Sequence, residues 1–236
     1  MTKLLYVTDV HGTIKTYERM FEMAKADDVE FIVFGGDITS GMNPSGQAFF
    51  LKFYLLPRLR EFRKAVKKPV FIMMGNDDFA SNFKLLKKAG KLRTAVILHR
   101  KFYKTGGFTV AGYPHINPTP FLLKDWEKTE EEIYSELSIM SKRMDADRTV
   151  FVFHAPPFGT KLDMLRNGEH KGSVAIRRFI EDTQPLVTLH GHIHESPQVS
   201  GQMKQKIGRT LCLNPGNARI ISIDLESLKI KRMDKE

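Results

Sequence analysis

The chain has 236 residues, 42% of them hydrophobic, which is enough for one substantial core, and we expect a single domain over residues 1–236. Its net charge of +10 favours anionic partners without choosing among phosphoesters, nucleic acid and a membrane surface. The single cysteine, Cys212, excludes an internal disulfide, and we expect it to be a buried thiol in a strand. Because the sequence shows neither a signal-peptide pattern nor an apolar run of bilayer length, we expect a cytoplasmic protein with no membrane partner.

The first half of the chain is predicted to alternate between strands and helices. Apolar, β-rich runs predict strands at residues 3–8, 31–35 and 69–75. The first intervening helix is indicated by apolar residues at helical spacing, namely Ile14, Tyr17, Phe21 and Ala24. A second helix, which Pro57 should kink, is expected to bury one face, formed by Phe49, Phe53, Leu56, Leu59, Phe62 and Val66. A shorter helix near residues 81–88 should end before Gly90.

The second half begins with three β-like stretches, at residues 95–98, 102–104 and 108–111. Thr129 and Glu132 form a capping box for a helix whose apolar stripe is Ile133, Leu137, Met140 and Met144. A strand at 149–153, a helix from about Ser173 and a strand ending at Leu189 follow. From Gln198 on, closely spaced short strands indicate antiparallel pairing or meanders. This order predicts helices packed outside two stacked sheets.

Polar residues follow five of the predicted strands. These clusters are Asp9-Val10-His11, Gly36-Asp37, Gly75-Asn76-Asp77-Asp78, His154, and His192 with His194. Each is by itself typical of a turn, a cap or a hydrogen-bonded histidine. Because the carboxyl ends of parallel strands meet at one edge, the five together favour a metal site. Gly191 should let the chain bend, and an extended backbone would turn both histidines of the last cluster toward one point.

The ordered set D-x-H, G-D, G-N-x-D, H and G-H-x-H resembles the motifs of the calcineurin-like metallophosphoesterases, over most of the chain from Asp9 to His194. The resemblance implies an α/β fold, a four-layer α/β/β/α sandwich of two mixed sheets flanked by helices, with a dinuclear metal centre. Carried over by position, Asp9, His11 and His194 would hold one metal. Asn76, His154 and His192 would hold the other, and Asp37 would bridge both.

Oxygen and imidazole ligands without thiolate suit manganese, iron, zinc or magnesium, and we favour manganese. Two such ions can clamp a phosphoryl group and lower the pKa of a bridging water, which provides hydroxide for in-line attack on phosphorus. The expected substrate is therefore a phosphate ester. We place Asp37, Asn76, Asp77 and His154 at the catalytic centre.

The sequence departs from the commonest family pattern at Asp77, which stands where a histidine usually follows the asparagine. A carboxylate beside two cations is held ionised, so Asp77 is a weak general acid. We therefore predict that diesters are cleaved faster than monoesters. Asp78 is expected to orient a ligand or to cap the next helix.

The loop of residues 155–172 leaves directly from His154 and is long enough to be functional. Lys161, Arg166 and His170 are its candidates for contacts with phosphate or the leaving group, with solvated charges as an equal alternative. The helix start at Gly172-Ser173 either binds an anion or is a simple cap.

Residues outside this loop carry weaker expectations. Residues 112–121 are a candidate rim of the site, and Tyr113 and His115 are its candidates for contacts, but we favour a structural role for these two. His99 is expected to lie at the surface, and His190 to be buried in its strand. The run Asn214-Pro215-Gly216 is expected to form a turn, and the family resemblance places a similar element near the site.

Two alternatives share this fold. The positive charge also suits a nuclease or nucleic-acid binder, but the basic runs near Arg58 and Lys84 lack the interleaved aromatic residues of a single-strand platform and are expected to be solvated helix faces. A non-catalytic scaffold would be expected to have lost metal ligands, and none is missing here. The sequence does not predict the oligomeric state.

Overall fold

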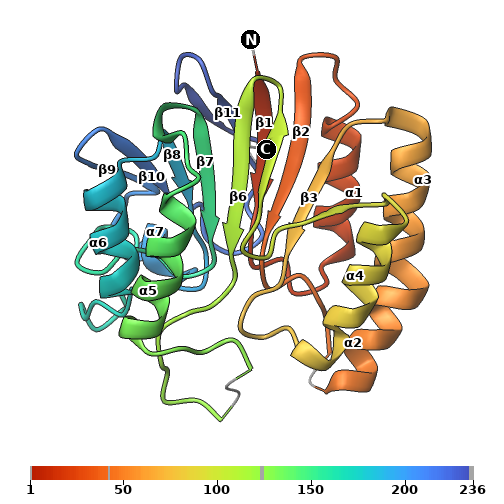
Figure 1. Ribbon diagram of the computed structural model, residues 1–236. Coiled ribbons are helices and arrows are strands. Elements are labelled where there is room, and N and C mark those ends of the chain that lie inside the picture. Colours follow the sequence, from red (N-terminus) through yellow and green to blue (C-terminus); the bar gives the residue numbers. More distant parts are fainter. Residues whose placement is uncertain (1, 42, 123–124, 234–236) are drawn as a thin grey trace.

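The computed structural model describes residues 2–41, 43–122 and 125–233, which form two six-stranded sheets flanked by helices (Figure 1). The first sheet has the order β12-β11-β1-β2-β3-β4, with β1 (Lys3–Val7), β2 (Val29–Gly35), β3 (Val70–Met73) and β4 (Val96–Ile97) parallel. β11 (Ile221–Asp224) and β12 (Ile230–Arg232) extend it with antiparallel pairing.

The second sheet has the order β5-β6-β7-β8-β10-β9. Its four central strands, β6 (Phe108–Tyr113), β7 (Thr149–Phe153), β8 (Val187–Leu189) and β10 (Thr210–Leu213), are parallel. β5 (Phe102–Thr105) and β9 (Lys204–Ile207) are antiparallel edge strands. The closely spaced C-terminal strands therefore pair in both ways, and they divide between the two sheets.

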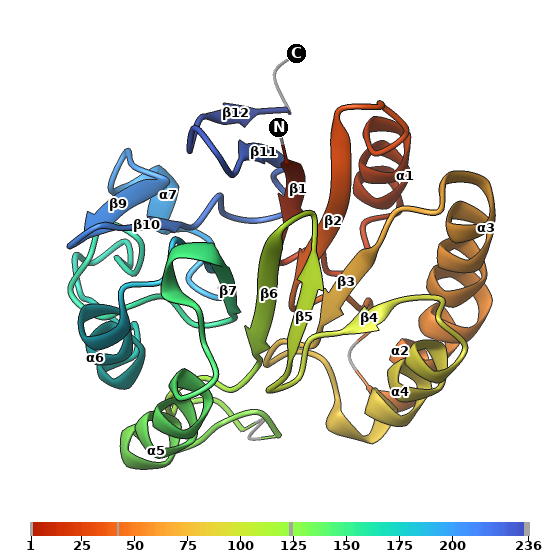
Figure 2. The same cartoon turned by 45° about the horizontal axis from the view of Figure 1, so that its top comes forward.

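Helices cover the outer face of each sheet (Figure 2). The first sheet is covered by α1 (Ile14–Met23), α2 (Pro44–Phe50), the π-helical turn η1 (Leu51–Leu55), α3 (Leu56–Val66), the 3-10 turn η2 (Ala80–Asn82) and α4 (Phe83–Lys91). The second is covered by α5 (Glu130–Ser141) and α6 (Val174–Thr183), with the short η3 (Ala146–Arg148) and α7 (Ser196–Val199) in connections. In the described part of the chain, no helix combines the length and apolar character needed to cross a bilayer.

The alternation of side chains along the strands builds three apolar layers. In β1, Leu4 and Tyr6 belong to the layer between the sheets, whereas Leu5 and Val7 face the helices of the first sheet. A third layer lies between the second sheet and α5 and α6. The four-layer α/β/β/α architecture is thus confirmed, and Cys212 is buried in β10 as predicted.

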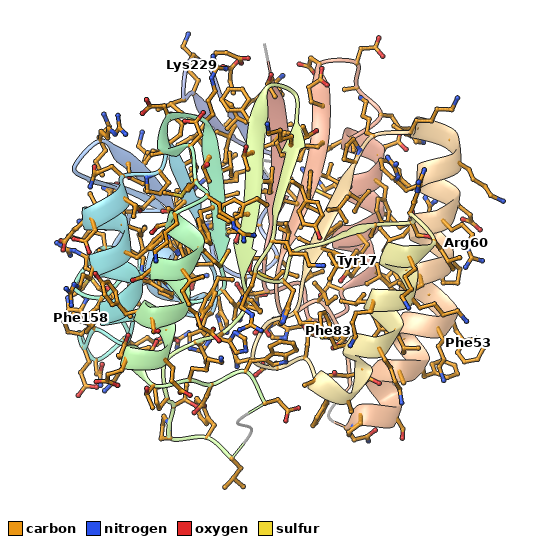
Figure 3. The ribbon with its side chains drawn as sticks, in the orientation of Figure 1. Tyr17, Phe53, Arg60, Phe83, Phe158 and Lys229 are labelled. Atoms are coloured by element: carbon orange, nitrogen blue, oxygen red, sulfur yellow. The ribbon has the colours of Figure 1, made fainter. Side chains whose placement is uncertain are left out.

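The predicted face of the second helix is wrong in its first half. Phe49 and Phe53 are 65% and 68% exposed, and Phe53 projects from the outer side of the helix pair (Figure 3), whereas Phe50 and Leu51 are buried. The cause is η1, because a π-helical turn adds one residue per turn and rotates the apolar stripe. This turn directly precedes Pro57, whose ring and missing N–H disturb the helical hydrogen bonds of the preceding turn.

Two other boundaries bear on the predictions. α4 runs through Gly90 to Lys91, so this glycine does not end the helix as expected. A Cβ at Gly90 would lie 2.9 Å from Cγ1 of Ile97, which shows that the position serves the close packing of α4 on β4. The capping box of Thr129 and Glu132 is present and starts α5 as predicted.

Candidate metal centre

All five polar clusters lie at the carboxyl ends of strands from both sheets. Asp9 and His11 follow β1, Asp37 follows β2, and Asn76 follows β3 in the first sheet. His154 follows β7, and His192 and His194 follow β8 in the second sheet. Parallel pairing brings the ends together within each sheet, and His154 of the second sheet lies 3.2 Å from Asp37 of the first.

Four of these residues have left-handed backbone, with φ of 52° at Asp9, 44° at His11, 48° at Asp37 and 63° at His192. Such conformations cost of order 1–3 kcal/mol each in a non-glycine residue and are concentrated at functional sites. The expected extended backbone around His192 is therefore wrong. The chain turns at His192 itself, and this turn aims its ring at the centre.

Gly191 allows the end of β8 to approach the end of β1 closely, and it does not produce the bend of the chain that was expected there. A Cβ at this position would lie 2.2 Å from Oγ1 of Thr8 and 2.5 Å from Oδ2 of Asp9. Because only glycine fits there, the end of β8 can approach the end of β1, and the His192 amide donates to Oδ1 of Asp9 at 3.1 Å.

One half of the centre forms around Oδ1 of Asn76. This oxygen lies 2.9 Å from Nε2 of His154 and 2.7 Å from Nδ1 of His192. Nε2 of His154 is also 3.2 Å from Oδ2 of Asp37. The other ring nitrogen of His154, Nδ1, lies 3.1 Å from the Gly35 carbonyl, which fixes the ring so that Nε2 faces the centre.

Two further groups of candidate ligand atoms share Asp37. Ligand atoms of Asp9, Asp37 and His154 are mutually within 4.8 Å, and so are those of His11, Asp37 and Asp77. Asp37 belongs to both groups. The rings of His11 and His194 meet edge to face with their centroids 6.2 Å apart. His194 thus borders the same half as His11, and Asp77 offers an additional carboxylate there.

The donor set fits divalent cations. Asp9 and Asp37 are both buried, and Oδ2 of Asp9 has no hydrogen-bond partner among the described residues. Buried carboxylates need compensating positive charge, and burial raises the pKa of Asp9. Burial opposes charge on His154 too, but the carboxylates of Asp37 and Asp9 raise its pKa to about 10. A protonated His154 thus supplies part of the charge that cations would provide.

Asp77 and Asp78 have different surroundings. The Asp77 side chain is about half exposed and lies 3.9 Å from Nδ1 of His11, while its amide donates to Asp37. Burial and the Asp37 carboxylate raise the pKa of Asp77. Asp78 is buried, and its carboxylate accepts bonds from the amides of Ile38, Thr39 and Gly75. It therefore fixes the turns that carry Asp37 and Asn76, and it does not cap the next helix.

The three loop candidates lie outside the groups of candidate metal ligands. Lys161 and Arg166 are exposed and contribute backbone amides, to Gln205 and Glu195 respectively. His170 lies with Nδ1 2.8 Å from Oδ1 of the buried Asp163. Lys171, which was not singled out from the sequence, instead lines a cavity beside His192 and His194.

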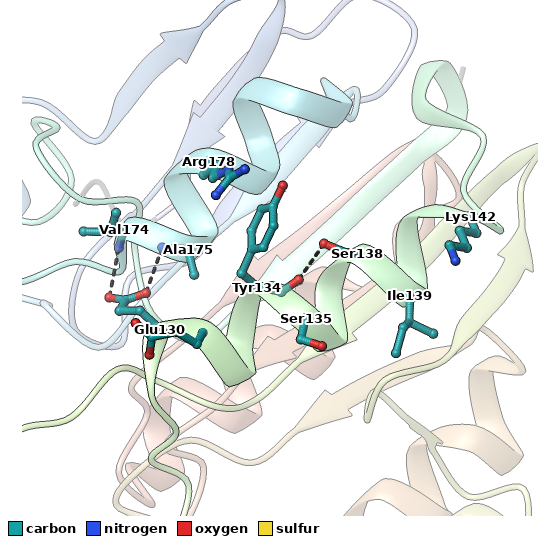
Figure 4. Close-up of a pocket in the computed structure, with 10 residues that line it drawn as sticks. Glu130, Tyr134, Ser135, Ser138, Ile139, Lys142, Val174, Ala175 and Arg178 are labelled. Carbon is teal, nitrogen blue, oxygen red and sulfur yellow. Dashed lines mark hydrogen bonds between the residues drawn. The ribbon is translucent and has the colours of Figure 1, made fainter.

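The start of α6 binds a carboxylate of the same chain, that of Glu130. The Glu130 carboxylate accepts bonds from the amides of Val174 and Ala175 (Figure 4). It also accepts a bond from the Ser173 hydroxyl. Ser173 caps the helix as well. A groove of 610 Å³ runs between α5 and α6 at this point, and it contains none of the candidate metal ligands.

His99 is not at the surface as expected. It is half buried, and its ring lies between those of Phe83, His115 and Trp126, at centroid distances of 4.7, 5.9 and 5.9 Å. Burial lowers the pKa of His99 to about 4 and that of His115 to about 3. These aromatic residues join α4, the end of β6 and the segment around Trp126.

The remaining expectations agree with the structure. Tyr113 is buried and donates to Glu136, and His190 is buried against the Ala155 carbonyl. Asn214 donates to the carbonyls of Leu162, Gly191 and Ile193, and so braces the turn that carries His192 and His194.

Comparison with known proteins agrees with this geometry. A family model described as calcineurin-like phosphoesterase matches residues 2–196, whereas no curated protein sequence matches the chain. Among solved structures, TT1561 of Thermus thermophilus is 18% identical with a TM-score of 0.72, over 98% of this chain and 97% of that one.

Two more distant structures share the fold. A dimetal phosphatase from Danio rerio is 10% identical with a TM-score of 0.61, over 93% of this chain and 92% of that one. GAP50, described as the anchor in the inner membrane complex of Plasmodium, is 12% identical with a TM-score of 0.54, over 100% of this chain and 89% of that one. At such identities the likeness to solved structures shows the fold alone.

Proposed function

We propose a dinuclear metal enzyme, from the premise that this chain belongs to the calcineurin-like phosphoesterases and is a hydrolase of phosphoric esters. We further propose that the enzyme prefers diesters to monoesters. The whole chain, residues 1–236, would form one catalytic domain. One ion would be held by Asp9, His11 and His194 and the other by Asn76, His154 and His192, with Asp37 shared. Manganese as the metal and the cytoplasm as the compartment remain predictions.

The observation that carries this proposal is the convergence of separate strand ends on Asp37. Its carboxylate lies 3.2 Å from His154 and 4.0 Å from His11, which come from different sheets. Oδ2 of the buried Asp9, which has no hydrogen-bond partner among the described residues, adds an acceptor that a cation would satisfy. When bound, two divalent ions would polarise the phosphoryl group and lower the pKa of a water between them.

Other residues of the chain orient the candidate metal ligands. The Gly35 carbonyl fixes the ring of His154, and the Asp9 carboxylate accepts the His192 amide, so both imidazoles are positioned before substrate binds. Asp78 holds the turns of Asp37 and Asn76 through three backbone amides. This preorganisation favours a single geometry for in-line displacement.

Asp77 supports the preference for diesters by its charge. Without metal, burial and Asp37 raise its pKa, but nearby divalent cations would oppose that shift and keep it ionised. An ionised carboxylate repels a dianionic monoester more than a monoanionic diester, and it is a poor proton donor to a leaving alcohol.

The test compares two substrates with the same leaving group, bis-p-nitrophenyl phosphate and p-nitrophenyl phosphate, on the manganese-loaded protein. We expect kcat/KM to be at least about tenfold higher for the diester, which corresponds to about 1.4 kcal/mol. A higher kcat/KM for the monoester would overturn the preference.

The alternatives have less support. The anchor role of GAP50 is that protein's own, and a scaffold on the same fold does not require the clustered carboxylates and imidazoles seen here. Nuclease activity would be a special case of diester cleavage. A nuclease should lose nucleic-acid affinity steeply as salt rises, which separates it from an enzyme for small esters.

A further inference from the structure

A cavity of 270 Å³ lies directly beside the proposed metal centre. His192 and His194 form part of its wall, so the cavity adjoins the place where a phosphoryl group would be bound. Its other walls come from residues 117–121, from Leu165 and Lys171 of the loop after β7, and from Ile193 and Glu195. Three segments far apart in the sequence thus enclose one space at the edge of the site.

The walls of this cavity are mainly apolar. The apolar residues that line it are Pro118, Pro120, Phe121, Leu165 and Ile193. Phe121 lines the cavity and is 67% exposed, so its ring is accessible to a ligand there. An apolar surface that opens toward charged metal ligands matches a substrate with an anionic centre and a hydrophobic substituent.

The charged residues of the wall do not favour a charged substituent. Lys171 is paired with Glu169 at 2.9 Å, and the Glu195 carboxylate accepts the Arg166 amide at 3.0 Å. The two residues have opposite charges, and each has a partner. These two residues therefore give the wall no excess of either charge that would favour a second phosphate or an ammonium group.

We propose that this cavity binds an uncharged aromatic ring carried by one ester group of the substrate, with the phosphoryl group at the metal centre. The inference rests on the proposed function and specifies its substrate class as phosphoesters with an aryl-type substituent. The flat faces of two prolines and Phe121 suit a ring, because aromatic contacts add to the free energy of apolar burial.

The test measures binding without turnover. Phenylphosphonate and methylphosphonate each carry one organic group on a phosphorus–carbon bond that a phosphoesterase does not hydrolyse, so calorimetry on the manganese-loaded full chain isolates the effect of the ring. We expect the phenyl compound to bind at least about tenfold more tightly.

The variants Phe121→Ala and Leu165→Ala should each reduce this ratio to below about threefold, because each removes apolar surface that the ring would contact. Leu122→Ala is the matched control, because Leu122 is apolar, 99% exposed and adjacent to Phe121 but does not line the cavity. Its ratio should stay at the wild-type value.

Equal affinities of the wild-type protein for the two phosphonates would overturn the inference, and so would a ratio that neither cavity variant changes. The failure of the proposed function is a separate result. Absence of turnover on both nitrophenyl esters would contradict the function, whereas normal turnover with equal phosphonate affinities would contradict only the cavity assignment.

Discussion

Single residues set the chemistry of this centre through their immediate neighbours. Asp37 is buried between His154 and His11 and accepts the Asp77 amide. Burial opposes its ionisation, but His154, His11 and the Asp77 amide together outweigh burial and lower the pKa of Asp37 to about 2. The carboxylate is therefore ionised and available to cations at all physiological pH values. Asp77, one residue after Asn76, is the position at which a single substitution should alter selectivity.

The substitution Asp77→His should raise the ratio of monoesterase to diesterase activity by at least about tenfold, because an imidazolium can protonate the leaving group and no longer repels a dianion. Asp77→Asn is the matched control, since it removes the charge but adds no acid. Its ratio should rise less than that of the histidine variant. The ratio of kcat/KM for nitrophenyl mono- and diesters provides the measurement, and equal ratios in both variants and the wild type would contradict the role given to Asp77.

At the scale of elements, helix starts and aromatic contacts hold the layers together around the site. Glu130 begins α5 and binds the first amides of α6, so one carboxylate serves two helix N-termini. The His99 and His115 rings connect α4 with the end of β6 beside Trp126, whose Nε1 donates to the Asp78 carbonyl. Both features lie close to the segments that carry site residues.

Glu130→Gln should lower the free energy of unfolding by about 1–2 kcal/mol, because the bonds to the α6 amides lose their charge assistance. Glu131→Gln is the control: it lies in the same first turn of α5 and is exposed. Denaturant unfolding of the two variants measures the difference. If both variants were equally stable, the contact to α6 would contribute nothing beyond the ordinary charge at a helix start.

Acid should destabilise the metal-free protein through His115. Its pKa is lowered by burial to about 3 from an ordinary value of 6.5, so the unfolded chain binds a proton first as the pH falls. The stabilisation is complete above pH 6.5 and is lost as the pH decreases toward the folded value. Between pH 6.5 and 4.5 the wild type should lose about 2 kcal/mol more than His115→Gln, as measured by denaturant unfolding at each pH. Parallel pH curves would contradict this.

For the whole molecule, the sequence predicts the parts that depend on local pattern. Strands ending in Asp9, Asp37, Asn76, His154 and His192 could be read from apolar runs that stop at polar residues, and the carboxyl-edge rule then places them together. Helix boundaries near η1 and Gly90 could not be predicted, because a π-helical turn and a close helix–strand contact depend on tertiary packing.

In the site, too, some features follow from local sequence pattern and others depend on tertiary packing. The candidate ligands that meet there were singled out from the sequence, but the left-handed backbone at four of them could not be predicted, because only neighbouring strands in the folded protein hold such conformations. The apolar cavity was likewise not predicted. Its walls come from two stretches that the sequence indicated near the site, residues 112–121 and 155–172, but these stretches carry no motif that predicts which of their residues meet beside His192 and His194.

The most direct test of the dinuclear centre measures bound metal together with diester turnover in the wild type, Asn76→Ala and His154→Ala. Asn167→Ala, an exposed asparagine outside the site, is the control. For the wild type, we predict about two manganese ions per chain and an activity that a chelator removes and manganese restores. In the two site variants, turnover should be at least about 100-fold lower and the metal content reduced. The control should keep the wild-type turnover and metal content. Turnover indifferent to the chelator and to both site substitutions would contradict the account.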